Sequence, residues 1–348
     1  MDDSRSARRD VALLLVAFVG SLLLLAGIAF ALASQPPSDG MAASGSPTSS
    51  ASAPPDGSAP PATGSGEPSG PASPVVPPPS QPPDDDPVLV GAGDIADCNT
   101  ADDEATAALL DGIDGTVYTT GDNAYPDGRL RDFEDCYEPT WGRHKDRTRP
   151  VPGNHDHRTE GLDGYLEYFG DAAVNSDGDP WYSYDLGQWH IVALDSECEE
   201  TETCDQGDQA AWLVDDLAAN DAFCTMAIWH VPRYSSGFHQ DDNDVEPFWE
   251  VLYEAGVDVI VNGHDHDYER FAPMNPDGEE DRERGMRQFI VGTGGTSLRP
   301  FEEIAENSEL RAAVSHGVLK FTLHDRTYDW EFVPTAGSFS DRGSAGCH

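Results

Sequence analysis

The sequence predicts an α/β domain preceded by two segments that do not fold with it. Three observations indicate this organisation: short apolar runs alternate with helix-period segments after residue 86, an uncharged apolar run lies near the N-terminus, and a stretch rich in Pro, Ser, Gly and Ala separates the two. The 348-residue chain is therefore expected to contain one globular domain, which we place at residues 87–348.

The N-terminal segment, residues 1–33, predicts export. Arg5, Arg8 and Arg9 precede an uncharged run from Val11 to Ala33, which at 1.5 Å per residue is long enough to span a bilayer. Basic residues before such a run place the N-terminus in the cytoplasm and the rest of the chain outside it. Two outcomes stay open: an uncleaved anchor in the cell membrane, which we favour, and a signal peptide cleaved near Ala33 that releases a secreted protein.

Residues 34–86 predict a disordered stalk. Their Pro, Ser, Gly, Ala and Thr side chains cannot bury enough apolar surface to offset the entropy of the chain, and the prolines favour extended conformations. If the N-terminal segment stays uncleaved, the stalk holds the domain away from the membrane.

Within the domain, the period of the apolar residues separates strands from helices. Buried strands are expected at Val88–Gly93, Thr116–Thr120, Trp189–Leu194, Cys224–Trp229, Val257–Asn262 and Gln288–Gly292. Helical spacing is found at Asp102–Leu110, Gln209–Ala218 and Val245–Ala255. Near the end, Gly317–Leu323 and Tyr328–Val333 form a strand pair without an intervening helix, which favours a mixed sheet over a purely parallel one.

The charge balance excludes one class of partner. Lys and Arg total 20 against 64 Asp and Glu, a net charge of -44. Such a surface repels nucleic acid, whose phosphates need basic patches, so no nucleic acid binding is expected. The acidity fits either an ordinary solvated surface or adaptation to high salt.

The cysteines predict disulfides. None of the six lies in a C-x-x-C zinc pattern, and the predicted export places them in an oxidising compartment. The five residues between Cys198 and Cys204 can close a small loop, which predicts this local pair, while Cys98–Cys136 and Cys224–Cys347 are predicted from spacing and position.

Polar side chains suited to metal binding follow the predicted strands. The motifs are Gly93-Asp94, Gly121-Asp122-Asn123, Gly153-Asn154-His155-Asp156, Trp229-His230 and Gly263-His264-Asp265-His266. Ligands of open α/β sheets collect at such strand ends, so we expect these side chains to converge. No Gly-x-Ser-x-Gly elbow and no Gly-x-x-x-x-Gly-Lys phosphate loop is present to support another chemistry.

This order of motifs resembles the calcineurin-like metallophosphoesterases over Val88 to His266. Tyr125, three residues after Asp122, and Tyr268-Glu269-Arg270 after the histidine pair are most similar to purple acid phosphatases and their bacterial relatives. The resemblance implies a four-layer α/β/β/α sandwich with mixed sheets and a two-metal site at the C-terminal ends of the strands.

The resemblance also implies a ligand set for two metal ions. One ion is bound by Asp94, Asp122, Tyr125 and His266, and the other by Asp122, Asn154, His230 and His264. The oxygen-rich set suits Fe(III), and the Asn and His set suits a divalent Fe, Zn or Mn. Tyr125 has a second interpretation, as an aromatic packing residue in a turn.

Three further residues are candidates for catalysis. His155 is assigned to charge stabilisation or protonation of the leaving group, and Asp156 is expected to hold its imidazole in position. His239 matches a substrate-facing histidine of purple acid phosphatases, or is an exposed loop residue. Asp265 is expected to orient a metal ligand. Arg270 is expected to pair with nearby carboxylates rather than with phosphate.

The expected function is hydrolysis of small phosphate monoesters by attack of a metal-bridging hydroxide on phosphorus. A phosphodiesterase or nucleotidase built on the same centre is the nearest alternative. An inactive surface-binding module that has kept the fold is the alternative from another class.

Overall fold

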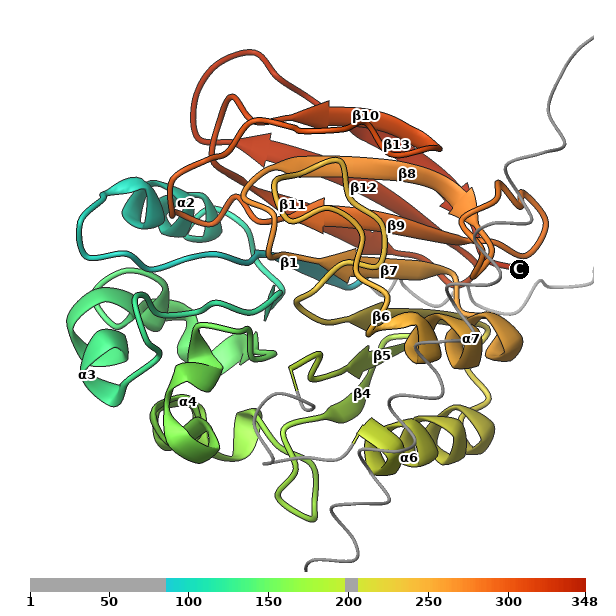
Figure 1. Ribbon diagram of the computed structural model, residues 1–348, viewed down its shortest axis with the longest axis horizontal. Coiled ribbons are helices and arrows are strands. Elements are labelled where there is room, and N and C mark those ends of the chain that lie inside the picture. Colours follow the sequence, from blue (N-terminus) through green and yellow to red (C-terminus); the bar gives the residue numbers. More distant parts are fainter. Residues whose placement is uncertain (1–85, 198–205) are drawn as a thin grey trace, which may run out of the picture. The chain divides into compact units, whose positions relative to one another are not determined.

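The computed structural model describes residues 86–197 and 206–348 (Figure 1). The predicted apolar run Val11–Ala33, the stalk before residue 86, and the predicted pair Cys198–Cys204 lie outside these residues, so they stay predictions. Within the described ranges, no helix has the length and apolar character that a membrane crossing needs.

The described residues form two β-sheets. The six-stranded sheet has the order β13-β12-β11-β1-β2-β3 and the seven-stranded sheet the order β10-β8-β9-β7-β6-β5-β4. The strands of the first sheet are β1 (Val88–Ala92), β2 (Thr116–Thr119), β3 (Thr148–Arg149), β11 (Gly317–Leu323), β12 (Thr327–Pro334) and β13 (Arg342–Gly346). Those of the second are β4 (Tyr182–Leu186), β5 (Trp189–Ala193), β6 (Cys224–Ile228), β7 (Val259–Asn262), β8 (Tyr268–Met274), β9 (Met286–Val291) and β10 (Ser308–Ala312).

Both sheets are mixed, as the sequence predicts. The strands β1, β2 and β3 run parallel, and so do β5, β6, β7 and β9. Antiparallel strands complete each sheet: β11 pairs with β1, β8 with β9, and β4 with β5. The parallel strands therefore present their carboxyl ends at one edge of each sheet.

Helices lie on the outer sides of the two sheets in a four-layer α/β/β/α arrangement, although the outer face of β12 and β13 remains partly exposed (Figure 1). The helix α2 (Asp102–Leu110) and the turn η2 (Trp141–Arg147) lie against β11 and β2, while α6 (Gln206–Ala219) and α7 (Glu246–Ala255) pack together over the second sheet. Shorter elements lie between β2 and β4: α3 (Leu130–Asp132), η1 (Phe133–Tyr137), η3 (Asp156–Arg158), η4 (Glu160–Leu162), α4 (Asp163–Phe169) and η5 (Gly170–Ala172).

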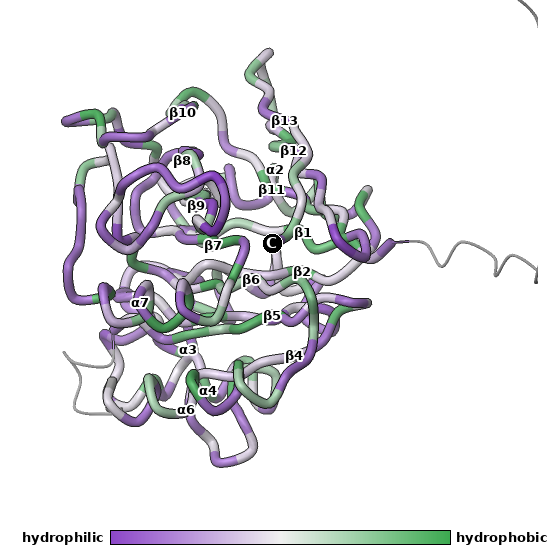
Figure 2. The backbone as a smooth tube through the Cα atoms, turned by 90° about the vertical axis from the view of Figure 1, so that its right-hand side faces the viewer, coloured by the Kyte–Doolittle hydropathy of each residue, from purple (hydrophilic) through white to green (hydrophobic). Residues whose placement is uncertain are grey.

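Alternation along the strands of the second sheet produces two apolar cores. Ile191 lies in the core shared with the first sheet, whereas its neighbour Val192 lies in the core under α6 and α7. Because both faces are buried, the parallel strands are continuous apolar runs. Figure 2 shows hydrophobic residues in the central strands and hydrophilic residues in many of the loops around them.

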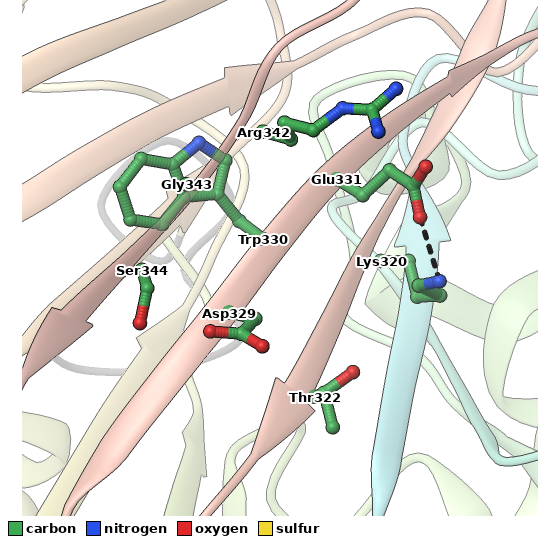
Figure 3. Close-up of a pocket in the computed structure, with 8 residues that line it drawn as sticks. All are labelled: Lys320, Thr322, Asp329, Trp330, Glu331, Arg342, Gly343 and Ser344. Atoms are coloured by element: carbon green, nitrogen blue, oxygen red, sulfur yellow. Dashed lines mark hydrogen bonds and ion pairs between the residues drawn. The ribbon is translucent and has the colours of Figure 1, made fainter.

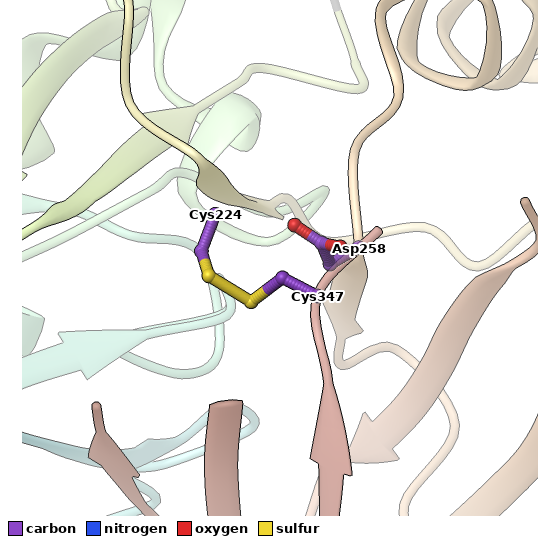
Figure 4. A group of neighbouring side chains, drawn as sticks. All are labelled: Cys224, Asp258 and Cys347. Atoms are coloured by element: carbon purple, nitrogen blue, oxygen red, sulfur yellow. A yellow bond between two sulfur atoms is a disulfide. The ribbon is translucent and has the colours of Figure 1, made fainter. Parts of the chain in front are cut away.

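Two disulfides join distant parts of the described chain. Cys98 bonds to Cys136, and Cys224 at the start of β6 bonds to Cys347 after β13 (Figure 4). Both pairings were predicted from spacing and position, and both are confirmed. They close loops of 38 and 123 residues, so they restrict the unfolded chain strongly.

Candidate metal centre

The candidate ligands follow the carboxyl ends of parallel strands from both sheets. Asp94 follows β1, Asp122 follows β2, and His230 follows β6. Asn154 comes from the loop after β3, and His264 and His266 come from the loop after β7. The structure brings all of these side chains, together with Tyr125, into one cluster.

The backbone of these loops is bent to aim the side chains inward. Asp94, Asp122 and His264 have φ values of 58°, 49° and 69°, in the left-handed region that non-glycine residues seldom adopt. Such conformations cost of order 1–3 kcal/mol each and collect at functional sites. The preceding glycines have a separate reason: a Cβ on Gly121 would lie 2.6 Å from His230 Nδ1, and one on Gly263 2.8 Å from Asp94 Oδ2.

Tyr125 is at the centre of the first donor group. Its hydroxyl lies 3.0 Å from Asp94 Oδ1, 2.8 Å from Asp122 Oδ2 and 3.3 Å from His266 Nε2. His266 Nδ1 donates to the carbonyl of Ser297, so its Nε2 carries a lone pair when the ring is neutral. One phenol proton cannot satisfy three acceptors, whereas a cation among them would meet all four atoms.

The second donor group is built from one amide and two imidazoles. Asn154 Oδ1 lies 3.1 Å from His230 Nε2 and 3.2 Å from His264 Nδ1, and the two ring nitrogens are 3.2 Å apart. His230 Nδ1 donates to the carbonyl of Thr120, which leaves Nε2 as an acceptor. Asn154 Oδ1 and His230 Nε2 are therefore acceptors that face each other and His264 Nδ1, as expected of ligands that share a metal ion.

Asp122 connects the two groups. Its Oδ2 faces Tyr125, while its Oδ1 accepts the backbone N–H of His155 at 2.7 Å and lies 3.5 Å from His230 Nε2. Asp122 is buried, with 2% of its surface exposed. A carboxylate in this position can bridge two cations.

The cluster lacks a positive charge of its own. Within the described ranges, the ion pairs of Asp94 and Asp122 involve only histidines. Burial and the nearby Asp122 raise the pKa of Asp94 well above its ordinary value, and burial lowers the pKa of His264 well below its own. Burial, followed by the charge of Arg299, lowers the pKa of His266 to about 4. Two crowded carboxylates beside neutral imidazoles form a donor set that fits metal ions.

The expected role of Asp156 is wrong. Its Oδ2 accepts hydrogen bonds from the backbone and side-chain amides of Asn123 and from Gly153 N, so it braces the ligand loops and does not contact the ring of His155. The His155 ring is held instead by the carbonyl of Pro126, to which Nδ1 donates at 2.6 Å. His155 Nε2 lies 3.8 Å from Asp122 Oδ2, at the partly exposed side of the cluster.

His239 lies at the cluster, and Asp265 holds it there. The ring of His239 stacks on His264 with 3.9 Å between centroids. Asp265 Oδ1 accepts the backbone N–H of His239 at 2.9 Å and lies 3.1 Å from its Nδ1. Asp265 was expected to orient a metal ligand, but its partners are His239 and Ser235.

Arginines near the motifs have different environments. Arg270 pairs with Asp341 and Glu309, as expected, and so does not face the cluster. Arg299, which the sequence did not single out, donates from Nη1 to His239 Nε2 at 3.1 Å. It lies 60 residues from His239 in the sequence and belongs to none of the motifs described above.

Two other polar groups lie apart from this cluster. A depression of about 440 Å³ lies on β11, β12 and β13, and its lining includes Lys320 and Arg342 (Figure 3). The ammonium of Lys320 pairs with Glu331 at 2.8 Å.

The side chains of Cys224, Asp258 and Cys347 also lie together (Figure 4). Both sulfurs are in the disulfide, so neither is a thiolate that could bind metal.

Comparison with known sequences gives a family match and several relatives that are named acid phosphatases. The profile of the calcineurin-like phosphoesterase family matches residues 80–268. Purple acid phosphatase 23 of Arabidopsis thaliana is 31% identical over 168 residues, which cover 42% of this chain and 35% of the relative. Purple acid phosphatase 21 of the same plant is 27% identical over 254 residues, covering 62% and 57%. This chain therefore matches between about a third and just over half of these relatives' lengths.

Solved structures share the fold at low sequence identity. A purple acid phosphatase from yellow lupin, Lupinus luteus, has a TM-score of 0.60 and 18% identity, with 75% of this chain and 53% of that chain covered. GAP50 of Plasmodium, described as the anchor in the inner membrane complex, has a TM-score of 0.57 and 16% identity, with 75% and 89% covered. These likenesses establish the two-sheet architecture.

Proposed function

The chain belongs to the calcineurin-like phosphoesterase family, and on this premise we propose that it is an exported dinuclear-metal phosphatase acting on phosphate monoesters. The observation that carries the proposal is Asp122, whose two carboxylate oxygens face two separate groups of donor atoms. One group is Asp94, Tyr125 and His266, and the other is Asn154, His230 and His264.

Each donor group suits a different ion. The carboxylate and phenol oxygens favour a hard trivalent ion such as Fe(III), and the amide and imidazoles favour divalent Fe, Zn or Mn. When bound, the two ions would supply an activated water and neutralise charge on the phosphoryl group. The residues of the chain hold this arrangement rigidly, because Thr120 and Ser297 fix the rings of His230 and His266 through their carbonyls.

His155 lies where it could donate a proton to the leaving group. Its Nδ1–H is fixed by Pro126, so Nε2 is the atom directed at the cluster side, near Asp122. Arg158 donates to this Nε2 at 3.1 Å, so that contact must break before Nε2 can carry a proton to a leaving group. We assign His155 Nε2 to protonation of the leaving oxygen after this exchange, a role that typically contributes 10²- to 10⁴-fold to a rate. His239, stacked on His264, is assigned to contact with the substrate phosphate.

The disulfides support location outside the cytoplasm. Cys98–Cys136 and Cys224–Cys347 are the kind of bond that persists in oxidising compartments and is rare in the cytosol. Together with the apolar run Val11–Ala33, they favour a protein that is anchored at the membrane or secreted after cleavage near Ala33.

The ester preference is tested with a matched pair of substrates. The metal-loaded protein is assayed on nitrophenyl phosphate and bis(nitrophenyl) phosphate, before and after chelation and after re-addition of Fe, Zn or Mn. We expect hydrolysis of the monoester to be preferred and to require metal. Preference for the diester would favour the phosphodiesterase alternative. Binding of metal without turnover of either ester would favour a binding module that has kept the fold.

A further inference from the structure

Arg299 lies at the rim of the candidate metal centre without a carboxylate partner. Among the ion pairs within 4.0 Å in the described ranges, none includes Arg299. No carboxylate within this distance therefore competes for its guanidinium at the place where an anionic substrate would arrive.

The loop that carries Arg299 is fixed to the cluster. The backbone N–H of Arg299 donates to the carbonyl of His266 at 3.0 Å, and the carbonyl of Ser297 accepts from His266 Nδ1 at 2.9 Å. The guanidinium carbon lies 5.1 Å from the ring centre of Phe238, within the range of a cation–π contact. These contacts orient the guanidinium without using its hydrogen-bond donors.

Most of those donors remain available. A guanidinium carries five N–H donors, and in the described ranges only His239 Nε2 accepts one of them. His239 is held from its other side by Asp265 Oδ1 at 3.1 Å. The imidazole and the guanidinium are thus placed side by side, next to the stacked ring of His264.

Arg158 has a different environment. It donates to His155 Nε2 at 3.1 Å and to the carbonyl of Pro126 at 3.0 Å, and it lies 3.7 Å from Asp127 Oδ1, a carboxylate that also pairs with Arg129. The donors of Arg158 are therefore shared among protein acceptors, whereas most donors of Arg299 are left for a ligand.

We propose that Arg299, oriented by His239, is an anion-recognition residue that selects doubly charged phosphate monoesters over singly charged phosphodiesters. The inference rests on the proposed function and names the substrate class of the same site. With a second pKa near 6, a monoester carries close to two negative charges at pH 7, whereas a diester carries one. A full positive charge beside the phosphoryl group therefore favours the monoester, and a planar guanidinium can donate two hydrogen bonds to its oxygens.

The test compares Arg299→Gln with wild type on nitrophenyl phosphate and bis(nitrophenyl) phosphate. We expect kcat/KM for the monoester to fall about 10- to 100-fold, the loss expected for hydrogen bonds to a charged group, and that for the diester to fall less than about threefold. Arg299→Lys should restore part of the monoester activity, because it keeps the charge. The matched control is Arg326→Gln at the β11–β12 turn, where the guanidinium contacts Phe223 and should not affect the ratio.

A second readout does not depend on turnover. Calorimetric titration of the metal-loaded protein with inorganic phosphate should show weaker binding in Arg299→Gln by a factor similar to the loss in monoester kcat/KM. Equal losses on both esters, or unchanged phosphate affinity, would overturn the anion-recognition role. If wild type hydrolyses neither ester, the proposed function fails, while the phosphate titration still tests Arg299.

Discussion

Replacing Asp122 by Asn tests whether this residue bridges two metal ions. The change keeps the shape of the side chain but replaces one carboxylate oxygen by an NH₂ group. The backbone N–H of His155 needs an acceptor 2.7 Å away, so the remaining oxygen should take the place of Oδ1. The NH₂ group would then face Tyr125, where Oδ2 now lies 2.8 Å from the phenol oxygen. The substitution should therefore damage the site of Asp94, Tyr125 and His266 more than the other site.

The size of the effect follows from the lost charge. Two unit charges 4 Å apart at an effective dielectric constant of 20 interact by about 4 kcal/mol, which corresponds to about 10³-fold in affinity and is a lower bound for a multivalent ion. We expect the metal content, measured by elemental analysis, to fall from about two ions per chain towards one. Turnover of nitrophenyl phosphate should fall by at least about 10²-fold, since the activated water depends on both ions.

A matched control separates bridging from general damage. Asp258 is equally buried at 3% exposure, accepts hydrogen bonds from Thr225 N and His348 N, and lies beside the Cys224–Cys347 disulfide at the start of β7. Asp258→Asn should leave the metal content unchanged. Full metal content and near-normal turnover in Asp122→Asn would refute the bridging assignment.

Three further predictions test other parts of the molecule. His155→Ala should keep both metals and lose about 10²- to 10⁴-fold in turnover, and loss of metal would instead make His155 a ligand. Tyr125→Phe should abolish the visible absorption band expected of an iron-loaded wild type while the ring remains packed. An unchanged band, or a wild type without one, would leave Tyr125 as a packing residue. Cys224→Ser should lower the free energy of unfolding by about 2–5 kcal/mol, because the bond closes a loop of 123 residues, and an unchanged denaturant midpoint would contradict this.

The helices and strands that could be predicted are those whose buried face requires apolar residues at a regular spacing in the sequence. The bounds of α2 and β11 agree with the structure residue for residue, because each is a continuous stretch with one apolar period. The strand β8 was missed because it contains Pro273 and a shift in register between Arg270 and Pro273. The edge strand β13 was missed because Arg342–Gly346 has no large apolar residue.

The convergence of the candidate ligands was predictable because the loops that carry them approach so closely that only glycine fits at several positions beside the ligands. A Cβ on Gly153 would lie 2.5 Å from Asp122 Oδ1, and one on Gly292 2.6 Å from Asp94 Oδ2. Close approach of the loops therefore restricts residue type at positions next to the polar side chains, and that restriction is visible in the sequence. Gly292 belongs to this arrangement although no ligand follows it directly, which no motif revealed.

Contacts around the histidines of the site were not predictable, because neighbours in the sequence need not be neighbours in space. Asp156 follows His155 directly, yet its carboxylate turns into the protein to bind Asn123. His239 receives its carboxylate from Asp265, 26 residues away, and its arginine from 60 residues away. The contact of Asp156 depends on how the loops after β2 and β3 pack together, and those of His239 depend on the loops after β6, β7 and β9. No local pattern encodes this packing. The candidate metal ligands were therefore recognisable from sequence, whereas the residues proposed to select the substrate emerge only when the loops are assembled.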